Sequence, residues 1–65
     1  MKKKFNVEIL YEDESGFNFD VELEGTENEI HGEIMMITRG TLLSSNGCRA
    51  TAYKDDGFDV CSYTR

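Results

Sequence analysis

The sequence predicts a small α+β domain of the ββαββ type, with one helix packed on a four-stranded, mainly antiparallel sheet. Three observations support this prediction. Two segments at each end of the chain alternate apolar and polar residues, as strands do. A short glycine-containing turn separates the members of each pair, and one long amphipathic segment lies between the pairs. We place the strands at about residues 4–12, 17–24, 48–54 and 58–64 and the helix at about 27–45, in a single domain of residues 1–65.

The first two strands form a hairpin, and the expected turn defines how they pair. If residues 14–16 are a three-residue loop with Gly16 in the left-handed conformation, Ile9 pairs with Val21 and every apolar residue faces another. The apolar face of this hairpin contains Phe5, Val7, Ile9, Tyr11, Phe17, Phe19, Val21 and Leu23.

The central helix has clear signals at both ends. Thr26 and Glu29 have the spacing of a capping box, and Asn46-Gly47 favours the left-handed conformation that ends a helix. A stripe of residues with helical spacing is expected to face the sheet. It consists of Ile30, Ile34, Ile37 and Thr41.

The helix contains more apolar residues than this stripe requires. Met35 and Leu42 flank the stripe on one side, and Met36 and Leu43 flank it on the other. Gly32, Met36, Gly40 and Leu43 also form a row along the helix. Either the glycines allow a second helix to approach closely, or the methionines wrap a curved sheet and Gly40 ends the helix.

The second hairpin is expected to turn at residues 55–57, again a three-residue loop that ends in glycine. Lys54 then pairs with Phe58, and Cys61 lies on the face away from the helix. Because this register puts Cys48 and Cys61 three pairs apart and on opposite faces, we predict no disulfide. The helix-facing residues are Ala50, Ala52, Phe58 and Val60. The outer face carries Thr51, Tyr53, Cys61 and Tyr63, with Leu10 alongside.

A right-handed crossover through the helix favours the strand order 2-1-3-4, with all neighbours antiparallel. The alternative is the order 1-2-3-4, in which the middle pair is parallel.

Charge and composition exclude several classes of protein. The net charge is −6, and residues 5–38 contain no lysine or arginine. This distribution argues against a nucleic-acid-binding protein, which needs a basic surface. No signal peptide and no membrane-spanning segment are expected. With two cysteines and no export signal, the predicted location is the cytoplasm.

The sequence contains no recognisable catalytic, metal-binding or cofactor-binding motif, so we predict that the protein is not an enzyme. His31 is the only histidine, and the cysteines lack the Cys-x-x-Cys spacing of zinc sites. The carboxylates at residues 55–59 do not match a calcium loop. Catalysis by His31 or Cys61 is the weakest of the hypotheses considered.

Two kinds of contact surface are predicted instead. The first is an acidic face on the outer side of the first hairpin, where Glu8 is expected to oppose Glu22. It consists of Glu8, Glu12, Asp20, Glu22 and Glu24, and is either a docking patch for a basic partner or a solvated surface. The second is a self-association surface, for which the candidates are Met35, Met36, Leu42, Leu43, Tyr53 and Tyr63.

The leading functional hypothesis is a small, acidic, non-catalytic protein-interaction module that forms a homodimer and leaves its acidic face free for a protein with a basic surface. The alternative is an inhibitor of the kind encoded by phages or mobile elements. Such a protein would block a basic nucleic-acid-binding surface by charge mimicry.

Overall fold

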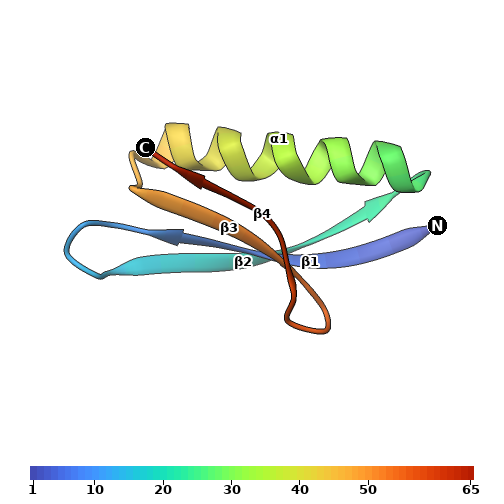
Figure 1. Cartoon of the computed structure of the whole chain (residues 1–65), viewed down its shortest axis with the longest axis horizontal. Helices are drawn as coiled ribbons and strands as arrows, with labels where there is room; N and C mark the ends of the chain where they lie inside the picture. The colour runs from blue at the N-terminus through green and yellow to red at the C-terminus, as the bar shows by residue number, and fades with distance from the viewer.

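The computed structural model describes residues 1–65, which form one helix on one face of a four-stranded sheet (Figure 1). The strand order is β2-β1-β3-β4, and every neighbouring pair is antiparallel. This confirms the predicted fold class and strand order. The elements are β1 (Lys2–Leu10), β2 (Gly16–Glu24), α1 (Glu27–Ser45), β3 (Arg49–Lys54) and β4 (Asp59–Thr64).

Both ends of α1 form as predicted. Thr26 and Glu29 form a reciprocal capping box, in which each side chain accepts the other residue's backbone N–H. Asn46 ends the helix in the left-handed conformation, with φ of 59°. Gly40 lies inside the helix and does not end it.

The buried side of α1 differs from the predicted stripe. The buried residues Ile30, Ile34, Thr38 and Leu42 follow one another at intervals of four. Such a row is inclined to the helix axis, as suits a straight helix on a twisted sheet. Ile37, expected at the centre of the stripe, is only half-buried. Thr38 tolerates burial because its hydroxyl donates to the carbonyl oxygen of Ile34, at 2.6 Å.

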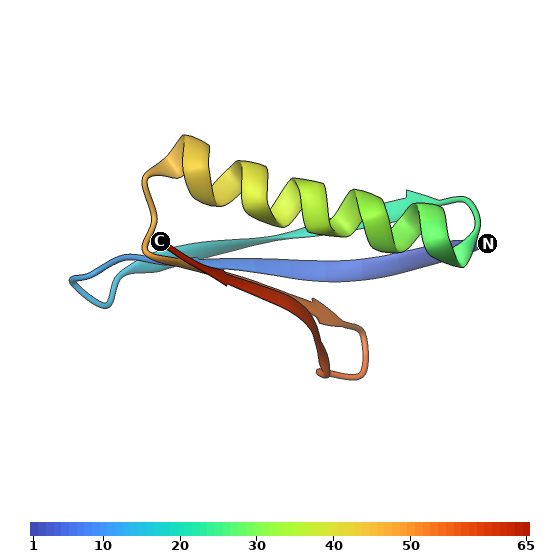
Figure 2. The ribbon, with the colours of Figure 1, turned by 45° about the horizontal axis from the view of Figure 1, so that its top comes forward.

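The core lies between α1 and the two central strands (Figure 2). The helix packs most extensively on β3, where Ala50 and Ala52 are fully buried and allow close approach. The helix makes its smallest contact with β2. The apolar core consists of Phe5, Val7, Ile9, Leu23, Ile30, Ile34, Leu42, Ala50 and Ala52.

The predicted register of the first hairpin is wrong by four residues, although its faces are right. Ile9 pairs with Phe17, not with Val21. The connection is a five-residue loop, residues 11–15, and its left-handed residue is Glu14, not Gly16. The Asp13 carboxylate accepts hydrogen bonds from both the backbone N–H and the hydroxyl of Ser15. These bonds complete the turn before Gly16, so that β2 begins at this residue. A shift by an even number of residues keeps the same side chains on the same face.

Two glycines are required by close packing. A Cβ atom on Gly16 would collide with the carbonyl oxygen of Ile9. A Cβ atom on Gly47, just after the helix, would lie 2.6 Å from the Cγ2 atom of Ile9. Both glycines therefore let a neighbouring segment pass close to β1.

The second hairpin contains a β-bulge that was not expected from the sequence. Near the turn the register is as expected, since the Lys54 N–H donates to the Phe58 carbonyl oxygen at 2.9 Å. Between the Tyr53–Asp59 and Ala52–Cys61 pairs, β4 has one extra residue, Val60. A single-residue shift moves every later side chain to the opposite face. Beyond the bulge, the register expected from the Lys54–Phe58 pair is therefore wrong.

Both cysteines are free in the structure. The bulge pairs Cys61 with Ala52, so this thiol lies on the helix-covered side of the sheet, where it packs against the core. The predicted position of Cys61 on the outer face is wrong. Phe58, expected beneath the helix, is 68% exposed at the turn.

The helix α1 is not apolar enough to cross a membrane.

Candidate interaction surfaces

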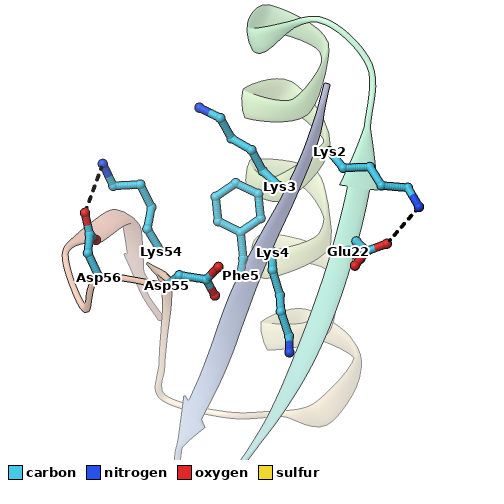
Figure 3. A pocket seen from close by; sticks show the side chains of 8 residues that line it. All are labelled: Lys2, Lys3, Lys4, Phe5, Glu22, Lys54, Asp55 and Asp56. Carbon is cyan, nitrogen blue, oxygen red and sulfur yellow. Dashed lines mark ion pairs between the residues drawn. The ribbon is translucent and has the colours of Figure 1, made fainter.

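A lysine-lined pocket lies at the end of the sheet where β1 begins (Figure 3). It has a volume of about 490 Å³, and Phe5 is its only apolar lining residue. Pairing of Phe5 with Lys54 brings the β3–β4 turn beside the amino-terminal lysines. This cluster could not be predicted from the sequence, because it depends on the register between β1 and β3. The lining residues are Lys2, Lys3, Lys4, Phe5, Glu22, Lys54, Asp55 and Asp56.

Carboxylates neutralise most of the charge of this pocket. The Lys2 ammonium lies 3.4 Å from Glu22, and Lys54 lies 4.0 Å from Asp56. Lys3 donates to the Glu27 carboxylate at the start of α1, at 3.2 Å. Exposed pairs of this kind stabilise little, but they leave no strong positive field for an anion.

The predicted acidic face is divided by the register that the structure shows. Glu8 pairs with Asn18 rather than with Glu22, so the expected pair of opposed glutamates does not form. Lys4 and Lys2 lie opposite Glu22 and Glu24. Asp20 accepts a hydrogen bond from the Asn6 amide at 3.0 Å, and Glu12 lies in the loop beyond the strands. A basic partner for these residues stays a prediction.

The predicted tyrosine patch does not form on one face. Tyr53 lies opposite Asn6 on the outer face of the sheet, whereas the bulge turns Tyr63 to the helix side, opposite Ala50. Between these strands the outer face is polar, because the Thr51 and Ser62 hydroxyls lie 3.2 Å apart in a hydrogen bond. The outer face therefore offers one isolated aromatic side chain.

The outward side of α1 carries the most exposed apolar side chains of the helix. Met36 is 74% exposed and Leu43 is 56% exposed. They are seven residues apart, so both lie on the side of α1 turned away from the sheet. Met35 is partly exposed on a flank. Leu42, predicted as a contact residue, is buried in the core and unavailable to a partner.

Gly32 and Gly40 belong to the same outward side. Apart from the adjoining helix backbone, no atom of the chain lies within 4 Å of the position that a Cβ atom would take on either residue. Unlike Gly16 and Gly47, these glycines therefore have no packing role inside the domain.

His31 and the cysteines show no catalytic arrangement. His31 lines an open groove of about 350 Å³ together with Val60 and Asp59. Cys61 follows Val60 on the same side of the sheet, which corrects the expectation that the sheet separates it from His31. No group of three or more histidine, cysteine, aspartate or glutamate side chains could hold a metal ion.

Two carboxylates have shifted pKa values. Hydrogen bonds from the Ser15 side chain and backbone lower the pKa of Asp13. Hydrogen bonds from Thr26, chiefly its backbone N–H, lower the pKa of Glu29. Both carboxylates are exposed, so their lowered pKa values result from the hydrogen bonds of the turn and the helix cap and do not indicate a reactive site.

The Glu29 cap is expected to make the stability of the domain pH-dependent. Because the folded state lowers its pKa, the ionised carboxylate stabilises the fold at neutral pH, and this contribution is lost as the pH falls below about 4. Glu29→Ala should lower the urea midpoint at pH 7, and the difference from wild type should shrink at acid pH. Glu33→Ala, which removes an exposed helix carboxylate without a cap role, is the matched control when all proteins are compared at concentrations where they are monomeric. Equal midpoints for the two variants at neutral pH would contradict the cap.

No protein-family model matches the sequence, and comparisons with curated proteins and with solved structures also gave no match.

Proposed function

We propose that this chain is a non-catalytic protein-interaction module that works as a homodimer, and that the outward side of α1 is its contact surface. The exposure of Met36 carries this proposal, because it is the most exposed large apolar side chain of the domain. Leu43 extends the same surface by two helical turns. Exposed apolar side chains that gather on one face often mark a contact with another protein.

The two glycines support the same conclusion. A glycine inside a helix costs about 1 kcal/mol of stability relative to alanine. Gly32 and Gly40 meet no neighbouring atom in the domain, so the fold does not benefit from the absence of their side chains. The absence of these side chains would instead favour packing against a second helix, because glycine lets two backbones approach closely.

The other surfaces fit this role less well. The outer face of the sheet is polar around Thr51 and Ser62. The lysine-lined pocket is largely neutralised by its own carboxylates. The outward side of α1 lies on the opposite side of the molecule from the outer face of the sheet, and no other helix or strand covers it (Figure 2).

The small size of the surface is typical of weak, transient contacts. A helix of 19 residues is about 28 Å long, so a contact between two helices buries less than the roughly 800 Å² per partner of a standard interface. We therefore expect a dissociation constant in the micromolar range, with association measured over nanomolar to millimolar concentrations.

Met36→Glu is expected to abolish self-association, because each copy would bring a charge into the apolar centre of the contact. Sedimentation equilibrium should show a dimer for the wild type and a monomer for this variant at the same concentrations. Phe58→Glu is the control, since it changes a similarly exposed apolar residue at the β3–β4 turn. A wild-type protein that stays monomeric at millimolar concentration would overturn the proposal, and so would a dimer that Met36→Glu leaves intact.

A further inference from the structure

The outward side of α1 has a row that is symmetric about Met36. Gly32 and Gly40 lie four residues before and four residues after it, and all three residues are exposed. Rows of residues at intervals of four interleave in the commonest class of helix packing, with a crossing angle of about −50°. Met36 would then lie near the crossing point, with one glycine on each side of it along the helix axis.

Opposite charges flank this row on its two sides. Glu33 precedes Met36 by three residues and Arg39 follows it by three. At about 100° per residue, they lie roughly 60° to either side of Met36. Both are exposed, and neither belongs to a salt bridge of the domain, which pairs only Lys2, Lys3 and Lys54 with carboxylates.

The orientation of the pair decides which flanks meet. If the helices run in the same direction, a two-fold axis along them brings the Glu33 flank of one copy against the Arg39 flank of the other, on both sides of the crossing. If the helices run in opposite directions, the two-fold axis is perpendicular to them. Each flank of one copy then lies against the same flank of the other copy. Glu33 then approaches a second Glu33, and Arg39 approaches a second Arg39.

We propose that the partner of α1 is the same helix of a second copy, running in the same direction, with two symmetric ion pairs between Glu33 and Arg39. This inference rests on the self-association proposed above and adds its geometry and its specificity-determining residues. Charge complementarity favours this orientation because the antiparallel pair opposes like charges. Glu33 and Arg39 thus select the orientation, while Met36 supplies the apolar contact.

Charge reversal tests the ion pairs. Glu33→Arg or Arg39→Glu alone turns both attractive pairs into repulsive ones, so each should weaken dimerisation about tenfold in sedimentation equilibrium at low salt. The double variant Glu33→Arg/Arg39→Glu restores both pairs and should return to within about threefold of wild type. High salt should reduce the differences. Equal affinities for wild type, single variants and double variant would overturn the inference, because an antiparallel pair opposes like charges in all four proteins.

Disulfide trapping tests the orientation independently. With Cys48 and Cys61 replaced by serine, Gly32→Cys should crosslink to itself on oxidation, since a parallel crossing places the two residues within the roughly 7 Å that a disulfide allows. In a mixture with Gly40→Cys, only like-with-like dimers should form, as read by mass spectrometry. A mixed Gly32→Cys/Gly40→Cys disulfide would show an antiparallel pair and overturn the inference, while leaving self-association intact. A monomeric wild type would instead overturn the proposed function itself.

Discussion

Ile34→Ala is expected to remove most of the stability of this domain. Ile34 has no exposed surface and belongs to the buried row of α1. Truncating a buried isoleucine to alanine costs about 2–5 kcal/mol of the free energy of unfolding, because it removes buried surface and leaves a cavity. Small domains lie near the lower end of the usual range, at about 5 kcal/mol. The melting temperature, followed by circular dichroism, should fall by at least about 10 °C.

Met36→Ala is the matched control for this experiment. It truncates a side chain of similar size two residues away, on the exposed side of the same helix. At concentrations where the protein is monomeric, its free energy of unfolding should stay within about 0.5 kcal/mol of wild type. Equal losses for Ile34→Ala and Met36→Ala would contradict the packing of α1 on the sheet.

Replacing Gly32 and Gly40 together by alanine is expected to have two opposite effects. The monomer should become more stable by about 2 kcal/mol, because each substitution removes the conformational cost of a helical glycine and meets no neighbouring atom. The dimer should become weaker by about tenfold, because the new methyl groups hold the two helices apart. Thermal unfolding at low concentration measures the first effect, and sedimentation equilibrium measures the second.

His31→Ala separates helix stabilisation from the contact itself. His31 is exposed in α1 and lies roughly 140° around the helix from Met36, away from the row of Gly32, Met36 and Gly40. Alanine there should raise the helix propensity and leave dimerisation unchanged. If the double glycine variant dimerises as tightly as wild type, the glycines are not part of the contact and the crossing on this row is wrong.

Self-association would also explain how so small a domain remains folded. One helix and one sheet bury a core of nine apolar residues and leave the outward side of α1 exposed. A partner that binds only the folded chain adds to its stability by mass action. We therefore expect wild type to melt at a higher temperature as its concentration rises, and Met36→Glu to show no such dependence.

The helix and the strand order were predictable because their signals are local or topological. Thr26 and Glu29 mark the start of α1, and Asn46 marks its end, through bonds between residues close in the sequence. A right-handed crossover favoured the order β2-β1-β3-β4 over the order 1-2-3-4, and the structure has the favoured order. The exposed Met36 and Leu43 were also among the predicted contact residues.

In both hairpins, the alternation of apolar and polar residues is not enough to predict how the strands pair. In the first, alternation is the same after a shift of four residues, so only the Asp13–Ser15 turn decides the register. In the second, adjacent apolar residues Val60 and Cys61 interrupt the alternation, a signal that could have indicated the bulge. Without the bulge, Cys61 and Tyr63 are assigned to the wrong face.

The ββαββ fold, the start of α1 and the apolar faces of β1 and β2 could be predicted from the sequence, because caps and alternation depend on neighbouring residues. The choice between the two strand orders, the continuation of α1 through Gly40 and the free side of α1 were settled by packing in three dimensions. The twisted sheet buries the row that ends at Leu42 and leaves Met36 in solvent. Register and bulge likewise decided which charges and tyrosines lie together, because side-chain pairing across strands depends on packing between residues far apart in the chain.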